Sequence, residues 1–142
     1  SMRVPFIVRW PGKVKAGKKV ENTITLMDCY PTLLDMAGIE KPDDLLLRGR
    51  SFYPVLKGAD QRFTDTVFGQ LDTLRSIRTP EWKFVYHFGD TTNNEFYHLA
   101  GDPGESNNLI SSADGDLIRK RSEIRDILFD YMKLIKDPLL ED

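Results

Sequence analysis

The side chains that most often do chemistry are few in this chain, which has one cysteine, Cys29, and two histidines, His87 and His98. A thiol becomes reactive when a nearby cation lowers its pKa, and no lysine or arginine lies close to Cys29 in the sequence. A general base needs a positioned partner and a metal site needs several converging ligands, but each histidine stands alone beside aromatic residues. We therefore expect a buried structural thiol at Cys29 and packed or hydrogen-bonded imidazoles at both histidines.

A basic set consists of Arg75, Arg78 and Lys83, and an arginine can clamp an anionic group through two parallel hydrogen bonds. Arg75 and Arg78 are three residues apart, so a strand places them on opposite faces, which favours a solvated surface for both. The sequence contains no Ser-His-Asp order, no glycine-rich phosphate loop and no cluster of carboxylates. It therefore predicts no catalytic and no metal-binding residue among these 142 positions.

Composition restricts the class of function. With 142 residues, 40% hydrophobic and 30% charged, the chain has the balance of a globular domain or of a part of one. A net charge of −2 argues against a nucleic-acid partner, because such domains usually carry a strong positive excess. The longest stretch without a charged residue, Ser106–Ala113, is short and polar, whereas a membrane helix needs about 18 apolar residues. The sequence therefore predicts neither a nucleic-acid nor a membrane partner.

The first residues indicate a chain that is part of a longer polypeptide. Ser1, Met2 and Arg3 lead almost directly into an apolar run, without the basic leader, apolar core and cleavage site of a secretory signal. We therefore expect any such signal to precede these residues, so the sequence leaves the localisation unknown.

The elements that must position these side chains begin with a strand and a helix. Pro5–Trp10 is expected to be a strand buried on both faces, because its apolar residues do not alternate with polar ones. Apolar spacing predicts a helix over Asp28–Ala37, with the Asp28 carboxylate capping its start and Gly38 ending it. A further helical turn is expected over Ser51–Lys57.

Four short strands and one long helix are predicted in the rest of the chain. The strands are Thr66–Leu71, Leu74–Arg78, Lys83–Phe88 and Glu95–Leu99. Their short connections join antiparallel neighbours, because parallel strands need a crossover of a dozen or more residues. The amphipathic helix Asp114–Lys136 needs an apolar surface, and the sheet is the only large one available. We therefore predict an α+β fold, a four-stranded antiparallel sheet packed against a long C-terminal helix.

Five blocks of the sequence, in order, resemble type I sulfatases, which are members of the alkaline-phosphatase superfamily. The blocks are Arg3–Gly12, Asp28–Gly38, Gly49–Gly58, Arg75–Tyr86 and Glu95–Leu109. In the family the first of them follows the active-site lysine segment. The second is similar to the family helix Asp-x-x-Pro-Thr-Leu-Leu-x-x-Ala-Gly, and the last is similar to the late signature Glu-Leu-Tyr-Asp-Leu, Asp-Pro-x-Glu and Asn-Leu. Five blocks in the right order are far more specific than any one of them.

The resemblance implies that the chain is the C-terminal portion of a sulfatase. Residues 1–60 would be the strand-helix segment that completes the large α/β domain, and residues 61–142 the small C-terminal subdomain. In the whole enzyme a formylglycine hydrate attacks the sulfur of a sulfate ester, while a divalent cation, usually calcium, and basic side chains stabilise the charge. In the family these groups lie in segments that precede Arg3. Cys29-Tyr30-Pro31 resembles the start of the formylglycine motif, but Leu33 stands where that motif requires arginine.

The implied partners are therefore the missing N-terminal sulfatase domain and, for the whole enzyme, a sulfated small molecule or glycan. In the family the small subdomain borders the active-site cleft, so Arg75 and His87 are the candidates for substrate contact. The exposed edge of Pro5–Trp10 predicts a homodimer through that strand, or else disorder or refolding of residues 1–30.

Two alternative functions remain open from the sequence. One is a stand-alone, non-catalytic binding or interaction module. The other is the C-terminal part of a related phosphonate monoester or phosphodiester hydrolase, since the late blocks are partly shared within the superfamily.

Overall fold

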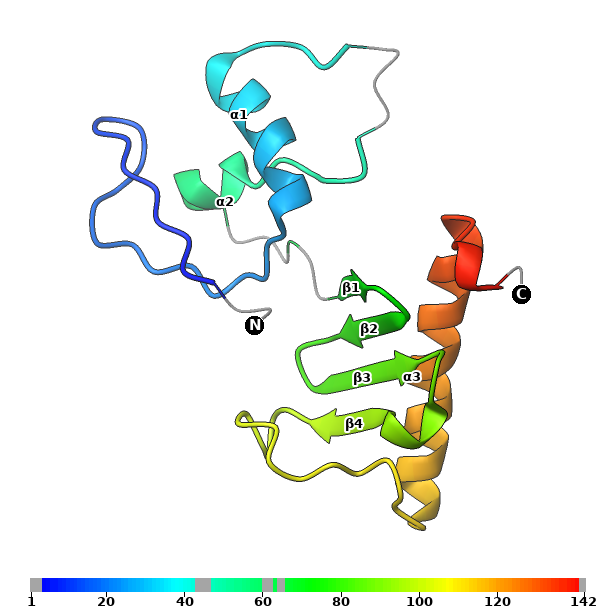
Figure 1. Ribbon diagram of the computed structural model, residues 1–142. Coiled ribbons are helices and arrows are strands. Elements are labelled where there is room, and N and C mark those ends of the chain that lie inside the picture. The colour runs from blue at the N-terminus through cyan, green and yellow to red at the C-terminus, as the bar shows by residue number, and fades with distance from the viewer. Residues whose placement is uncertain (1–3, 43–46, 60–62, 64–65, 141–142) are drawn as a thin grey trace. The chain divides into compact units, whose positions relative to one another are not determined.

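The computed structural model describes residues 4–42, 47–59, 63 and 66–140. The chain divides into two compact units, Ser1–Asp65 and Thr66–Asp142, and each is described by itself (Figure 1). The predicted boundary between residues 60 and 61 lies outside the described residues. The assignment of the two parts to domains of a larger enzyme stays a prediction.

The described residues of the first unit form three short helices around a small core. They are η1 (Leu26–Asp28), α1 (Cys29–Ala37) and α2 (Tyr53–Lys57). The predicted end of α1 is confirmed, because Gly38 adopts a left-handed φ of 68° that favours glycine. The core is apolar and comprises Phe52, Val55, Leu56 and Phe63, with partly buried side chains such as Val8 and Met36 against it.

The predicted capping role of Asp28 was wrong in one respect. Asp28 does precede α1, but its side chain makes no capping bond to that helix. Because Asp28 is also the last residue of η1, its carboxylate accepts hydrogen bonds from the backbone N–H groups of Thr25, at 2.7 Å, and Arg50, at 2.9 Å. Gly49 lies so close to the backbone of Met27 that a Cβ atom would clash there, so glycine permits this approach. The bond from Thr25 belongs to a capping box at the start of η1, so Asp28 caps η1 instead of α1 and also binds the segment that contains Arg50.

The segment Pro5–Trp10 is not a strand, and this prediction is corrected. A strand exists through backbone pairing, and no segment in the described part of the chain forms a ladder with it. Its aromatic side chains pack instead, Phe6 edge-on against Phe52 at 5.5 Å and Trp10 against Tyr53 at 5.7 Å between ring centroids. The predicted burial on both faces was wrong as well, because Phe6 and Ile7 are 49% and 88% exposed. The homodimer through this segment stays a prediction.

The second unit confirms the predicted sheet and helix. Its strands are β1 (Val67–Leu71), β2 (Leu74–Arg78), β3 (Trp82–His87) and β4 (Glu95–His98). They pair antiparallel in the order β1-β2-β3-β4, and α3 (Gly115–Leu134) covers one face of the sheet (Figure 1). The Asp114 carboxylate caps α3 by accepting from the N–H groups of Asp116 and Leu117. The observed α+β architecture is the predicted one.

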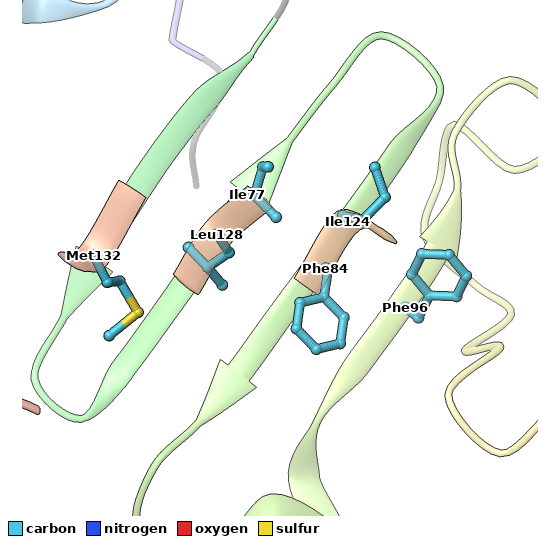
Figure 2. Close-up of a cluster of buried hydrophobic side chains, with 6 residues drawn as sticks. All are labelled: Ile77, Phe84, Phe96, Ile124, Leu128 and Met132. Carbon is cyan, nitrogen blue, oxygen red and sulfur yellow. The ribbon is translucent and has the colours of Figure 1, made fainter. Parts of the chain in front are cut away.

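The core of the second unit lies between the sheet and α3. Strand register aligns Ile77 with Phe84 and Phe84 with Phe96, so the three side chains form one row on the covered face. Ile124, Leu128 and Met132 of α3 recur every four residues and meet that row (Figure 2). Burying each such side chain contributes about 1.5–3 kcal/mol. Among the described residues no helix is long and apolar enough to cross a membrane.

Candidate functional site

The two residues predicted to contact substrate come from one end of the sheet, where the β1–β2 turn meets the β3–β4 loop. The Phe88 N–H donates to the Thr73 carbonyl at 3.0 Å, and Leu74 faces His87 in the β2–β3 register. The β3–β4 loop contains the short helix η2 (Thr91–Asn93). This bond joins the turn to the loop, but Arg75 faces Tyr86 in the same register, so the side chains of Arg75 and His87 lie on opposite faces of the sheet.

The two histidines have different surroundings. The His98 ring stacks on Trp82 with centroids 4.4 Å apart, which confirms the packed imidazole expected there. The His87 ring is 26% exposed, and its Nε2 atom lies 3.8 Å from Glu95 Oε1, too far for a hydrogen bond. This Nε2 is shielded from water and has no hydrogen-bond partner within the described ranges. An unsatisfied nitrogen of this kind costs about 1–3 kcal/mol. The atom is shielded from a ligand as it is from water, so a ligand would meet the exposed part of the imidazole instead.

The charges around His87 are acidic. Glu95 lies beside the ring, and Asp90 is the N-cap residue of η2 in the loop that follows His87. Hydrogen bonds from Thr92 lower the pKa of the Asp90 carboxyl, and the charge of His87 acts in the same direction. Carboxylates accept hydrogen bonds from hydroxyl groups and repel sulfate. This end of the sheet therefore suits a hydroxyl-bearing part of a ligand better than an anionic one.

Arg75 is buried, so the expectation of a solvated side chain was wrong. Its Nε and Nη2 donate to the two carboxylate oxygens of Asp137 at 2.6 and 2.9 Å. Its Nη1 donates to the carbonyls of Asp72 and Leu74. Alternation along a strand does place Arg75 and Arg78 on opposite faces, but it did not indicate that Asp137, after α3, would cover Arg75. These bonds occupy the guanidinium within the chain, and substrate contact by Arg75 stays a prediction.

Asp137 is a residue that sequence reasoning missed. Hydrogen bonds from Arg75 lower the pKa of its carboxyl below the ordinary value, although burial acts in the opposite direction. Its Oδ1 also accepts from the Leu139 N–H at 3.1 Å, and Gln70 donates to Oδ2 at 3.3 Å. The ion pair joins residues 62 positions apart, so no local pattern indicates it. Asp137 fastens the residues after α3 to the sheet.

The other two basic residues bind a carboxylate of their own chain. Arg78 Nη1 donates to Glu105 Oε1 at 2.9 Å, and Lys83 Nζ donates to Glu105 Oε2. Burial raises the pKa of the Glu105 carboxyl, but hydrogen bonds from Lys83 and Arg78 outweigh it and lower the pKa overall. Glu105 also has a φ of 55°, which is uncommon for a residue with a side chain. This cluster anchors the loop after β4, and the sequence indicated only a turn there.

The described residues fit neither a formylglycine site nor a calcium site. Cys29 is half-buried at the start of α1, less buried than expected, and its Sγ lies 4.0 Å from the Thr25 carbonyl oxygen. Leu33, at the position where the motif requires arginine, is exposed. Within the described ranges no three His, Cys, Asp or Glu side chains are grouped to hold a metal ion. We therefore assign no step of a reaction to these groups in this chain.

Comparison with protein families gives one match that covers most of the chain. The family described as N-sulphoglucosamine sulphohydrolase, C-terminal, matches residues 1–128. An N-acetylglucosamine-6-O-sulfatase from Bacteroides thetaiotaomicron is 31% identical over 95% of this chain and 26% of that protein. Human steryl-sulfatase is 41% identical over 44% of this chain and 11% of that protein. The chain thus spans about a quarter or less of the length of these curated relatives.

Solved sulfatase structures also match most of this chain and a third or less of their own length. A 2-O GAG sulfatase superposes with a TM-score of 0.64 at 29% identity, over 81% of this chain and 26% of that chain. A protein solved in complex with its substrate D-glucosamine-2-N,6-O-disulfate superposes with a TM-score of 0.70 at 27% identity. That match covers 96% of this chain and 30% of the other.

Proposed function

The chain belongs to the family of N-sulphoglucosamine sulphohydrolase C-terminal regions, and from this premise we propose that it serves as the C-terminal part of a sulfuric ester hydrolase. The predicted resemblance to sulfatases is confirmed. The observation that carries the proposal is the family match over residues 1–128, joined with a relative that aligns along 95% of the chain. The two curated relatives are sulfatases by name. Their names favour a sulfate ester as the substrate of the whole enzyme over the phosphonate and phosphate esters of the alternative hydrolase.

We propose that the chain by itself does not hydrolyse esters. The described residues offer no metal-ligand group and no complete formylglycine motif, so the reactive groups belong to another region of the enzyme. The formylglycine and the calcium ion expected for the whole enzyme are then held outside these 142 residues. The role of the chain is to support and border the active site.

The substrate that we propose is a sulfated sugar. The relative named for N-acetylglucosamine 6-O-sulfate aligns along nearly the whole chain, whereas the steryl-sulfatase aligns along less than half of it. The surface at His87 agrees with this class, since its carboxylates accept hydrogen bonds from sugar hydroxyls and repel a sulfate group. We assign His87 to a sugar hydroxyl and not to the sulfate.

The test compares two polypeptides encoded by the gene, this 142-residue chain and the product of the complete reading frame. Both are assayed on N-acetylglucosamine 6-sulfate, a steroid sulfate and an aryl phosphate. We expect the complete product to release sulfate from the sugar ester and the 142-residue chain to release none. Turnover of any ester by the 142-residue chain, or a reading frame without sulfatase-like sequence ahead of residue 1, contradicts the proposal and supports a stand-alone module.

The contact at His87 is tested in the complete product with His87→Ala. Loss of one hydrogen bond to a sugar hydroxyl predicts a kcat/KM about tenfold lower on the sugar sulfate. An aryl sulfate, which lacks those hydroxyls, serves as the matched control and should keep its kcat/KM. If His87→Ala leaves kcat/KM unchanged on the sugar sulfate as well as on the aryl sulfate, the contact is refuted. Arg75→Ala is a poor test, because it strands the buried Asp137 carboxylate and lowers stability.

A further inference from the structure

A pocket of about 340 Å³ lies between β3 and the first half of α3, within the unit Thr66–Asp142. Sites for small molecules usually measure roughly 300–1,000 Å³, so this volume suffices for a small ligand. The helix lines the pocket with Arg121, Ser122 and Arg125, and none of the described residues that line it is acidic. The pocket therefore favours an anionic ligand over a cationic one.

The two arginines of the pocket are placed to hold one anion together. Arg121 and Arg125 are four residues apart, so they lie on the same side of α3, where their like charges repel each other. An anion bound between them would offset that repulsion. Arg121 Nη1 donates to the Ile110 carbonyl, and Arg125 Nη2 donates to the Asp126 carboxylate at 2.9 Å. Because an arginine carries five N–H groups, both guanidinium groups keep donors for a ligand.

The ion pair between Arg125 and Asp126 is weak enough for a ligand to compete with it. Both side chains are exposed, and an exposed ion pair contributes little to stability. A planar guanidinium binds a sulfate or a carboxylate through two parallel hydrogen bonds, which are among the strongest polar contacts in proteins. An anion in the pocket is therefore expected to bind Arg125 in spite of Asp126.

The rest of the pocket combines aromatic surface with neutral hydrogen-bonding groups. Phe84 belongs to the core row (Figure 2), and Tyr86 packs edge-on against Phe129 at 5.2 Å between ring centroids, so both rings are held in place. The Asn94 Oδ1 atom accepts from the His87 N–H at 2.8 Å, which leaves the Asn94 Nδ2 group as a donor. A rigid apolar surface with a few polar groups suits a sugar ring, which has an apolar C–H face and a rim of hydroxyl groups.

We propose that this pocket binds an acidic sugar, with Arg121 and Arg125 on its sulfate or carboxylate group and the aromatic rings against its apolar face. The choice of a sugar over other anions rests on the proposed function. The pocket is separate from the surface at His87, because Tyr86 and His87 are consecutive in β3 and their side chains lie on opposite faces of the sheet. The carboxylates near His87 repel a sulfate group, whereas the pocket attracts one.

Titration of the isotopically labelled 142-residue chain, followed by NMR, tests the pocket directly. The probes are N-acetylglucosamine 6-sulfate, glucuronate, uncharged N-acetylglucosamine and inorganic sulfate. We expect one or both acidic sugars to shift the amide signals of the pocket residues and to bind roughly fivefold or more tightly than the other two probes, and the sugar that responds identifies the anionic group. No shift at the pocket with either acidic sugar overturns the proposal. Equal affinity for inorganic sulfate overturns it in favour of a simple anion site.

A matched pair of variants separates the pocket from the general charge of α3. Arg125→Gln removes a pocket arginine, and Arg119→Gln removes an arginine that does not line the pocket, while both residues are exposed and pair with a nearby aspartate. Because only the first variant loses charge-assisted bonds to the anion, we expect it to weaken binding about tenfold and Arg119→Gln about twofold or less. Unchanged amide signals outside α3 show that both variants fold. Equal effects of the two variants overturn the proposal.

An activity assay separates this proposal from the proposed function. The product of the complete reading frame is assayed for hydrolysis of N-acetylglucosamine 6-sulfate beside the titration. Sulfate release by the complete product without binding at the pocket overturns the pocket proposal and leaves the proposed function standing. Binding at the pocket with a complete product that hydrolyses no sulfate ester supports the pocket and overturns the proposed function.

Discussion

Helices α1 and α3 bury opposite kinds of side chain. In α3 the inward residues are Ile124, Leu128 and Met132, while charged side chains such as Arg119 and Asp116 pair on the exposed side. In α1 the inward residue at the centre is Thr32, which is held by hydrogen bonds, and apolar side chains face outward. Burial of apolar surface is the main favourable term in folding. Since α3 buries apolar side chains and α1 buries a polar one at its centre, the two helices differ in how much this term stabilises their units.

This difference indicates which unit covers its apolar surface with its own residues. The unit Thr66–Asp142 covers one face of its sheet with its own helix and fastens the residues after that helix through the Arg75–Asp137 pair. The unit Ser1–Asp65 has a small core and leaves an apolar stripe outside. We expect the second unit to resist unfolding by its own contacts, and the first to depend on a partner for a share of its stability.

The largest effect on this contrast is expected from Asp137→Ala. Removing one member of a buried ion pair leaves Arg75 charged and unpaired, which costs about 3–5 kcal/mol. Urea unfolding of the 142-residue chain, followed by circular dichroism, measures the loss. Asp116→Ala breaks an exposed pair with Arg119 and serves as the control, with an expected loss of about 0–1 kcal/mol. Similar losses for the two variants would show that the second unit is not fastened through Asp137.

A slightly smaller loss is expected from Leu128→Ala, which removes the centre of the α3 stripe. Truncating a buried leucine costs about 2–5 kcal/mol, depending on how far the cavity collapses. Leu134→Ala is the control, because Leu134 lies on the same helix and is 80% exposed. It makes the same change in helix propensity as Leu128→Ala but removes little packing. The difference between the two unfolding free energies measures the core alone. If the two variants lose nearly the same unfolding free energy, the second unit is not stabilised by its own core as we infer.

Acid should remove part of the same stabilisation. The pKa of the Asp137 carboxyl is lowered in the folded chain, so on acidification the unfolded chain takes up the proton first. The contribution is present above the unfolded pKa, near 3.8, and is lost as the pH falls through the lower folded value. Unfolding free energies measured between pH 6 and pH 2.5 should fall less steeply for Asp137→Ala than for the parent chain. Parallel curves refute this role of Asp137.

The sequence predicts the second unit well because its signals are local. Leu74–Arg78 matches β2 at both ends, since its turns and its alternation lie within a few residues. The amphipathic stripe of α3 likewise follows from spacing along one helix. Each of these elements requires only its neighbours in sequence to be recognised.

What the sequence does not predict depends on residues far apart. Pro5–Trp10 looks like a strand, but pairing requires another segment, and none of those described pairs with it. Alternation predicts that Arg75 and Arg78 lie on opposite faces, yet only the position of Asp137, 62 residues away, decides that Arg75 is buried. His87 is singled out by its residue type, whereas the missing partner of its Nε2 atom is a fact of packing. Sites therefore stay less predictable than elements.

The smallest effect is expected from Leu33→Ala in the 142-residue chain, and it bears most directly on the contrast. The Leu33 side chain is 61% exposed there, so truncation removes little buried surface and helix propensity changes only slightly. We expect the unfolding free energy to change by less than about 0.5 kcal/mol, the usual range for surface substitutions. Leu128→Ala, measured side by side, provides the opposite extreme. A loss at Leu33 close to that at Leu128 would mean that the first unit already covers its apolar stripe, and the difference between α1 and α3 would disappear.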